Sequence, residues 1–348
     1  MKFEKIFSDE LDHGYAVMRM HELHRDFVLI ASEEDRPCYA YDLDANYRRT
    51  TVWNDVGGTM TMVQIPGTLD FLATQRFYPG FNSATCRIIH ARFNGSDWDI
   101  TEVAQTPYIH RFDIIQGDGG YYFVGCSIAN TKRFTDDWSD PGKVLVGRFD
   151  EQSDTLSDVR PLDIRITKNH GYRRGEGNFS FITGAEGIFK LWYPSHGRDW
   201  RIERVADRES SDIAGVDINE DGHMEYLAIE GFHGEHLRLY DDHFNTIAVS
   251  QRATPFGHAI DGVTIFGKPL FLFGYRSGLQ ELEVVDLRDG ELHETPIDSG
   301  VGPSNVLVFA KHGHEFLLSA NREKNEIAIY RVSPCPPSSA SPDTESQV

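Results

Sequence analysis

Four histidines occur beside other residues that could carry out acid–base or metal chemistry. They are His13, His110, His170 and His258, and His170 lies in the hexapeptide NHGYRR. A neutral imidazole can take up a proton near neutral pH, and it is also a common ligand of transition metals. We therefore predict that all four are catalytic, with His170 or His110 as the base. The alternative is a Mn²⁺ or Zn²⁺ ion held by several of them.

Tyrosines and arginines could complete such a site. We expect Tyr172 or Tyr275 to act as the acid, because a phenol can donate a proton to a leaving oxygen. Arginine offers a planar pair of N–H donors that matches a carboxylate, and Arg174, Arg76 and Arg276 are expected to hold one. Further substrate contacts are predicted for Arg111, Arg322, Trp138 and His233.

These groups together predict a β-elimination. A carboxylate bound by arginine withdraws electrons, so the hydrogen on its α-carbon becomes more acidic. A histidine or tyrosine could remove that proton while a second group protonates the leaving oxygen. The expected substrate is a small anionic sugar or a uronate-containing oligosaccharide. The sequence contains no nucleophile elbow, phosphate-binding loop or dinucleotide fingerprint that would favour another chemistry.

The elements that must position these residues are short β-strands in a repeated order. Seven similar apolar runs begin at Asp26, Asp70, Tyr121, Asn178, Glu225, Pro269 and Glu315. Successive runs start 44 to 57 residues apart, and most follow a turn signal such as Gly67-Thr68 or Asp221-Gly222. A third strand follows in every unit and a fourth in most. This period, with about four strands per unit, is typical of a propeller blade.

The fold predicted is therefore all-β, a seven-bladed β-propeller over residues 1–332 followed by a disordered tail at residues 333–348. The tail lacks core-forming residues. The seventh unit has only three strands of its own, and the N-terminal segment MKFEKIF is expected to supply the fourth and close the ring. A two-sheet sandwich built from the same strands is the alternative.

A ring of this kind brings distant residues together on one face. The loop that precedes each innermost strand and the loop between the second and third strands emerge on the same side, with the former nearest the axis. The four histidines fall in the first set of loops, and His233, Arg276 and Arg322 fall in the second. We expect these side chains to meet in one concave site.

The seven-bladed frame, the HGYRR sequence at residues 170–174 and the histidines at positions 13, 110 and 258 resemble the propeller polysaccharide lyases. These include ulvan lyases, oligogalacturonate lyase and the rhamnose–glucuronate lyases. The chain also resembles the propeller part of aldos-2-ulose dehydratase, which removes water from keto-sugars. The resemblance is architectural and covers residues 1–332. It implies a carbon–oxygen lyase that acts on a carbohydrate.

The fifth repeat contains a further motif, GVDINEDGHMEYL. Side-chain oxygens at alternate positions, with glycine at the turn, can wrap a Ca²⁺ ion. The segment resembles the calcium loop of FG-GAP or VCBS propeller repeats, which implies a structural Ca²⁺ with Asp217, Asn219, Asp221 and Glu225 as ligands. A hairpin turn without metal is the alternative.

Composition and charge argue against several other classes of function. Lys and Arg number 34 against 54 Asp and Glu, a formal net charge of -20, so the basic surface of a nucleic-acid-binding protein is absent. The sequence contains no run of about 18 apolar residues, the length needed to cross a membrane, and the acidic start lacks the apolar stretch of a signal peptide. We expect a cytoplasmic protein whose cysteines are free thiols.

Other functions compete with the lyase. A keto-sugar dehydratase would use the same acid–base groups, and a non-catalytic propeller could bind sugar or protein, for which the stretch at residues 77–81 (FYPGF) offers an aromatic patch. A metal-dependent hydrolase or lactonase would favour axial Asp212, Glu230 and Asn305. Loops that differ between the repeats favour an enzyme. The longest, at residues 128–144, is expected to overhang the site and to stack Trp138 on a sugar ring.

Overall fold

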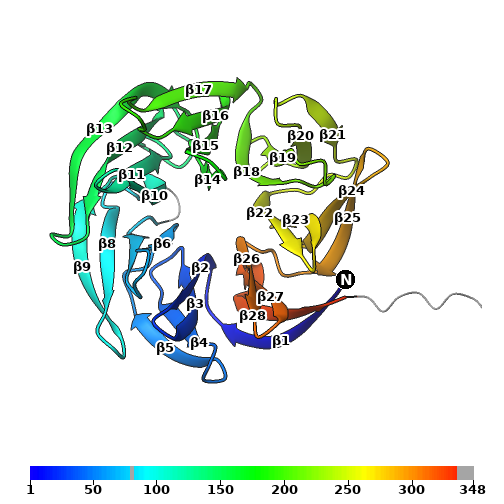
Figure 1. Ribbon diagram of the computed structural model, residues 1–348, viewed down its shortest axis with the longest axis horizontal. Coiled ribbons are helices and arrows are strands. Elements are labelled where there is room, and N and C mark those ends of the chain that lie inside the picture. Colours follow the sequence, from blue (N-terminus) through cyan, green and yellow to red (C-terminus); the bar gives the residue numbers. More distant parts are fainter. Residues whose placement is uncertain (79–81, 335–348) are drawn as a thin grey trace, which may run out of the picture.

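The computed structural model describes residues 1–78 and 82–334. Seven four-stranded antiparallel sheets stand around a central axis (Figure 1). This is the predicted seven-bladed β-propeller. The described residues hold 28 β-strands and one short 3-10 helix, η2 (Arg322–Lys324).

In each sheet the strands follow one another from the axis outward (Figure 1). The first three sheets consist of β2 (Gly14–Glu22), β3 (Arg25–Ser32), β4 (Cys38–Asp42) and β5 (Arg48–Trp53); β6 (Met62–Gln64), β7 (Phe71–Gln75), β8 (Arg87–Phe93) and β9 (Trp98–Gln105); and β10 (Ile109–Gly117), β11 (Gly120–Ser127), β12 (Gly142–Asp150) and β13 (Thr155–Ile166). The next three consist of β14 (Gly171–Arg174), β15 (Phe179–Gly184), β16 (Gly187–Trp192) and β17 (Arg201–Ala206); β18 (Ser210–Val216), β19 (Glu225–Glu230), β20 (His236–Tyr240) and β21 (Thr246–Val249); and β22 (Gly257–Ile265), β23 (Lys268–Tyr275), β24 (Leu282–Arg288) and β25 (Glu291–Asp298).

The seventh sheet combines both ends of the described chain. Its order is β26 (Asn305–Lys311), β27 (His314–Asn321), β28 (Glu326–Ser333) and β1 (Lys2–Glu10), with β1 antiparallel to β28. Lys5 on β1 lies 2.9 Å from carboxylate oxygens of both Glu326 on β28 and Asp298 on β25. The N-terminal strand is thus bound by its own sheet and by the sheet beside it.

The second strand of each sheet is the most buried part of the fold. Leu29, Phe71, Phe123, Phe181 and Phe271 are all at most 1% exposed. These strands read as near-continuous apolar runs because neighbouring sheets cover both of their faces. Their sequence period therefore gave the clearest signal of the repeat.

The predicted tail needs one correction and lies mostly outside the described residues. β28 continues to Ser333, one residue into the expected tail, whereas residues 335–348 and residues 79–81 of the FYPGF stretch fall outside. Cys38, Cys86 and Cys126 are buried free thiols, as predicted. Among the residues described, no helix has the length and apolar character needed to cross a bilayer.

Candidate functional site

A cavity of about 540 Å³ opens near the axis on one face of the ring. The loops before the innermost strands and the loops between second and third strands form it together, as predicted. All seven sheets contribute. The lining residues are Tyr15, Glu33, Met60, Phe77, Tyr78, His110, Ile128, Thr135, Asp136, Trp138, Lys168, His170, Phe232, His233, Phe256, His258, Arg276 and Arg322.

β-Bulges turn several of these side chains toward the cavity. In four sheets the register between the innermost strand and its neighbour shifts at a single residue, which is Tyr15, His110, Ser211 or His258. A bulge inserts one extra residue, bends the strand and re-aims that side chain. The same irregularity therefore presents a tyrosine or a histidine to the axis in three of these sheets.

Three of the histidines are anchored in the same way. Nδ1 of His110 lies 2.9 Å from the carbonyl oxygen of His170. Nδ1 of His170 lies 2.9 Å from that of Ser211, and Nδ1 of His258 lies 2.7 Å from that of Ser304. Because a carbonyl oxygen only accepts, each Nδ1 must carry the hydrogen, and Nε2 keeps its lone pair. Each anchor belongs to the next sheet around the ring.

Gly171 makes the His170 anchor possible. A Cβ at position 171 would lie 2.3 Å from Oγ1 of Thr183 and 2.6 Å from the carbonyl oxygen of Ser211. No side chain fits at those distances, so only glycine lets β14 approach the next sheet this closely. The glycine that follows His170 in the sequence is therefore required by packing.

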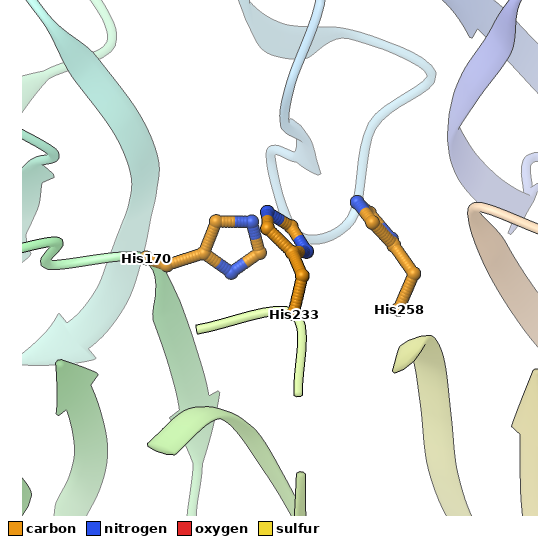
Figure 2. Close-up of side chains that lie close together, drawn as sticks. All are labelled: His170, His233 and His258. Atoms are coloured by element: carbon orange, nitrogen blue, oxygen red, sulfur yellow. The ribbon is translucent and has the colours of Figure 1, made fainter. Parts of the chain in front are cut away.

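His233 joins His170 and His258 in a compact group. It lies in the loop between β19 and β20, and its buried Nδ1 has no hydrogen-bond partner among the described residues. One ring nitrogen from each of the three residues lies within 4.8 Å of the others. Figure 2 shows the three rings side by side. We call His170, His233 and His258 the three-histidine group.

The donor chemistry of the three-histidine group fits a divalent transition metal. Three neutral imidazoles with a remaining position open to a cavity are the arrangement of catalytic zinc sites. With Zn–N bonds of about 2.1 Å, tetrahedral ligand nitrogens are about 3.4 Å apart, so small side-chain rotations would close the group around an ion. Imidazole ligands suit Zn²⁺ better than Mn²⁺, which prefers oxygen.

Tyr15 connects this group to His110. Its hydroxyl oxygen lies 3.3 Å from Nε2 of His110 and 3.3 Å from Nε2 of His258. A phenol has one hydrogen to donate, and it faces two lone pairs here. If His258 bound a metal through Nε2, the Tyr15 hydroxyl would donate to His110. The cavity thus combines the three-histidine group with a tyrosine–histidine pair.

Burial sets the protonation of these groups. It holds the pKa values of His110, His170 and His258 well below the ordinary histidine value, and it lowers the pKa of His233 to about 3. Burial also raises the pKa of Tyr15 to about 12. At neutral pH the rings are uncharged and the phenol is protonated, which leaves nitrogen lone pairs facing the cavity.

Three residues of the cavity wall have a strained backbone. Lys168, His233 and Phe256 have φ values of 52°, 51° and 65°, a left-handed conformation that is unfavourable for residues other than glycine. Such conformations persist where the surrounding structure enforces them, and they are frequent at functional sites. The loops that carry these three residues are therefore held in fixed shapes.

Seven residues predicted from the sequence line the cavity. They are His110, His170, His258, His233, Arg276, Arg322 and Trp138. Trp138 comes from the long loop between β11 and β12, so this loop does reach the cavity. The ammonium nitrogen of Lys132 lies 3.1 Å from the Trp138 ring centroid, and the edge of the ring meets Phe232 at 5.2 Å between centroids.

Two predicted acids lie elsewhere, which corrects the expectation that Tyr172 or Tyr275 faces the histidines. The Tyr172 hydroxyl donates to Asp113 at 2.9 Å, and Arg174 donates to both oxygens of the same carboxylate. The Tyr275 hydroxyl donates to Glu281. Each phenol serves a carboxylate, and neither belongs to the cavity lining. Arg174 is likewise committed and is not part of that lining.

His13, Arg76 and Arg111 also lie outside the cavity lining. Nδ1 of His13 is 2.8 Å from a carboxylate oxygen of Glu34, and the Arg76 side chain is exposed. Arg111 lines a second cavity of about 280 Å³ formed by the innermost strands. Its guanidinium carbon lies 5.6 Å from the ring centroid of Tyr15, so it acts on the site from the other side of that ring.

The predicted calcium loop is the connection between β18 and β19. Asp217 accepts a hydrogen bond from the Asp221 N–H at 3.1 Å, and Glu225 accepts one from the Ile218 N–H at 2.9 Å. The Asn219 amide donates to Asp221 and Glu225 at 3.1 and 3.0 Å. The oxygens expected to bind Ca²⁺ thus also hold the turn together, at the end of the sheet away from the cavity.

Tyr15, Glu33, Lys168 and Phe256 belong to the lining but were not predicted. For Tyr15 a signal was present, because the pair Gly14-Tyr15 occupies the same place in its repeat as Gly257-His258. Aligning the repeats on that glycine would have identified Tyr15 as the axial residue in place of His13. No comparable signal marks Glu33, whose position depends on how three sheets meet.

Comparison with known proteins supports the fold. The chain matches no protein-family model and no curated protein. Among solved structures it is similar to the WD40 β-propeller domain of Doa1, with a TM-score of 0.61 and 12% sequence identity. The similarity covers 94% of this chain and 96% of that one. At this identity the likeness shows a shared propeller fold and carries no function with it.

Proposed function

We propose that the protein is a metal-dependent carbon–oxygen lyase that acts by β-elimination on a small sugar acid or a uronate-containing oligosaccharide. The observation that supports this most is the three-histidine group, whose nitrogens lie within 4.8 Å of one another in a cavity. The cavity volume of about 540 Å³ is in the range of small-molecule sites.

Residues of this chain supply the remaining parts of the reaction. A Zn²⁺ ion bound by the three-histidine group would polarise the substrate carboxylate and make the α-hydrogen more acidic. Tyr15 lies within 3.3 Å of His110 and can exchange a proton with it. His110 is oriented for this by its hydrogen bond to the carbonyl oxygen of His170. Tyr15 and His110 are therefore the acid–base pair of the proposal.

The arginines support a role for metal in binding the carboxylate. Arg276 and Arg322 line the cavity, but both already pair with Glu323, at 2.8 Å in each case. An arginine that is neutralised in this way holds a second carboxylate weakly. Binding of the substrate carboxylate is therefore assigned to the three-histidine group, with Trp138 and Phe232 as apolar wall.

Elimination of water from a keto-sugar is the second candidate. The paired arginines favour it, because a cavity with neutralised guanidinium groups does not require an anionic substrate. The keto oxygen would take the place of the carboxylate, and Tyr15 and His110 would keep their roles. A propeller that binds sugars without a reaction would form neither the unsaturated uronate nor the dehydrated keto-sugar.

The test is an assay of the purified full chain with a panel of uronate oligosaccharides, followed by the ultraviolet absorbance of the unsaturated product. Protein stripped with a chelator and reloaded with Zn²⁺ or Mn²⁺ is compared with His170→Ala. Absorbance that requires metal and is lost in the variant supports the lyase. Activity that is unaffected by the chelator overturns the metal role. Loss of water from a keto-sugar, seen by mass spectrometry, supports the second candidate.

A further inference from the structure

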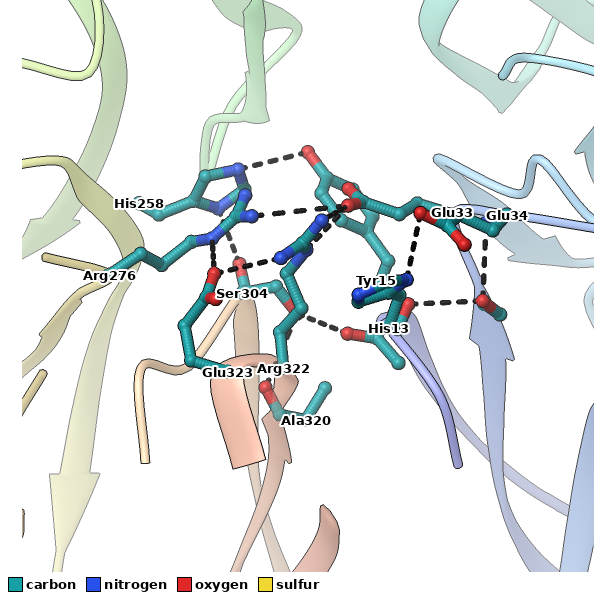
Figure 3. Close-up of polar contacts among 12 residues, drawn as sticks. His13, Tyr15, Glu33, Glu34, His258, Arg276, Ser304, Ala320, Arg322 and Glu323 are labelled. Carbon is teal, nitrogen blue, oxygen red and sulfur yellow. Dashed lines mark hydrogen bonds and ion pairs between the residues drawn. The ribbon is translucent and has the colours of Figure 1, made fainter. Parts of the chain in front are cut away.

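Four charged side chains form a closed ring at the edge of the cavity. Glu33 follows β3, Arg276 follows β23, and Arg322 and Glu323 lie in η2, so three sheets meet here. Arg322 donates to Glu33 through Nε and to Glu323 at 2.8 Å. Arg276 donates to Glu323 at 2.8 Å, and its Nη2 lies 3.9 Å from Glu33. Figure 3 shows these contacts, and we call the four residues the rim quartet.

The rim quartet is electrically neutral and largely buried. Glu33, Arg276 and Arg322 have side chains only 10%, 11% and 14% exposed. A substrate carboxylate could bind here only by displacing a carboxylate that is already well placed, with little net gain. The rim quartet is therefore poorly suited to clamp an anion.

A neutral hydroxyl group suits the rim quartet better. Within the described chain, the hydrogen bonds and ion pairs of Glu33 and Glu323 with Arg276 and Arg322 all use the Oε1 atom of the glutamate. Glu33 and Arg276 both line the cavity, and these contacts leave Oε2 of Glu33 as an acceptor and Nη1 of Arg276 as a donor. A hydroxyl can donate and accept at once, so two neighbouring hydroxyls match this pair.

The rim quartet also lies close to the three-histidine group. The Arg276 guanidinium carbon is 4.9 Å from the ring centroid of Phe256. The Phe256 ring in turn stacks on His233, with 4.5 Å between centroids and 8° between planes. One aromatic ring thus separates the two places, and Figure 3 shows Tyr15 and His258 beside Glu33 and Arg276. Glu33, Arg276 and the three-histidine group all line the same cavity.

We infer that Glu33 and Arg276, held in place by Arg322 and Glu323, bind vicinal hydroxyl groups of a sugar acid whose carboxylate occupies the three-histidine group. This inference rests on the proposed function for the carboxylate end. It names the substrate class as a polyhydroxylated ring acid and excludes simple carboxylic acids. Glu33 and Arg276 become the residues that determine specificity.

The test measures binding to the Zn²⁺-loaded full chain by isothermal titration calorimetry. Glucuronate is compared with tetrahydropyran carboxylate, which has the same ring and carboxylate but no hydroxyl groups. Glucuronate is expected to bind about tenfold or more tightly, because hydrogen bonds to charged groups contribute that much. Glu33→Gln should remove this preference and leave the affinity for tetrahydropyran carboxylate unchanged. Arg276→Gln should do the same.

Glu34→Gln is the matched control, since Glu34 is the next residue along the chain and contacts His13 outside the cavity. Equal affinities for the two acids in the wild type would overturn the inference even if Zn²⁺ binds. If no Zn²⁺ binds, the proposed function fails, and the hydroxyl site is then tested separately with a neutral methyl glucoside. Binding of that glucoside by the wild type and its loss in Glu33→Gln would support the site, and no binding would overturn it.

Discussion

His258 donates a hydrogen bond from Nδ1 to the carbonyl oxygen of Ser304 at 2.7 Å, so the main chain of the seventh sheet holds a side chain of the sixth. His170 and Ser211 repeat this relationship between the fourth and fifth sheets at 2.9 Å. A substitution at Ser304 or Ser211 would change the side chain and leave the main-chain carbonyl in place. These carbonyls fix both the tautomer and the ring orientation of the histidines. The ring of sheets itself therefore aims the Nε2 lone pairs into the cavity.

The three-histidine group predicts which substitutions abolish metal binding. His170→Ala should lower the affinity for Zn²⁺ by about 100-fold or more, because it removes one of three ligands. His110→Ala should retain Zn²⁺, since Nε2 of His110 faces Tyr15. His13→Ala, outside the cavity lining, is the control. Competition with a chromophoric chelator measures all three, and equal losses in His13→Ala and His170→Ala would contradict the assignment.

Tyr15→Phe removes the proposed proton carrier without changing the ring that packs on His258. We expect kcat to fall by about 100- to 10,000-fold, the usual contribution of a general acid or base, with Zn²⁺ affinity unchanged. Steady-state kinetics on a reactive substrate checks this. Tyr172→Phe is the matched control, because the Tyr172 hydroxyl serves Asp113. A Tyr15→Phe protein with wild-type kcat would remove Tyr15 from the mechanism.

Gly171→Ala places a methyl group 2.3 Å from Oγ1 of Thr183 and 2.6 Å from the carbonyl oxygen of Ser211. We expect the free energy of unfolding to fall by about 1–3 kcal/mol, the typical cost of overpacking. Gly14→Ala is the control, since the nearest atoms would be 3.6 Å away, and its effect should stay within about 0.5 kcal/mol. Urea denaturation followed by tryptophan fluorescence measures both. Equal effects would show that close packing at position 171 does not matter.

The ion pairs of Lys5 predict that part of the free energy of unfolding depends on pH. Burial acts to raise the pKa values of Asp298 and Glu326, but the hydrogen bonds and charge of Lys5, together with hydrogen bonds from other neighbours, outweigh it and hold both pKa values below their ordinary values. A carboxylate with a lowered pKa stabilises the fold above its unfolded pKa of about 4 and loses that contribution as the pH falls through the folded value. Lys5→Met should therefore cost on the order of 1 kcal/mol at neutral pH, given the partial exposure of the pair.

That cost should shrink as the pH falls below about 4, where the carboxylates of the unfolded chain become protonated, and should vanish below the lowered pKa values of the folded protein. Urea unfolding of the wild type and of Lys5→Met across acidic and neutral pH gives the difference directly. Lys2→Met is the control, because Lys2 is exposed and pairs with Glu4 on its own strand at 3.8 Å. A difference that is independent of pH would show that the charge of Lys5 does not hold β1.

The loop between β18 and β19 predicts a response to calcium. If Asp217, Asn219, Asp221 and Glu225 bind Ca²⁺, saturating Ca²⁺ should raise Tm by a few degrees relative to protein in EGTA. Asp221→Asn should abolish that rise. Differential scanning calorimetry with and without Ca²⁺ makes the comparison. An unchanged Tm would identify the loop as a hairpin held by its own hydrogen bonds.

The sequence by itself determined the seven repeats and the strands within them. Runs such as the one from Asp26 or Pro269 are apolar throughout because neighbouring sheets bury both faces of the strand. The residue types alone therefore indicate this burial. The same period placed His110, His170 and His258 before innermost strands, and all three line the cavity. Residues whose place follows from the repeat could therefore be predicted.

Tertiary structure alone decided the rest. Gly14 marked the axial place of Tyr15 in the sequence, but a period of about 45 residues does not resolve a shift of one residue, so the structure was needed to place Tyr15 there instead of His13. Tyr172 lies two residues after His170 but donates to Asp113 of the neighbouring sheet, because His170 lies in the loop before β14 whereas Tyr172 lies within the strand. Arg276 is neutralised by Glu323, and Arg322 by Glu33, in each case from another loop. Pairing between distant loops depends on how the sheets pack around the axis, and local sequence does not encode it.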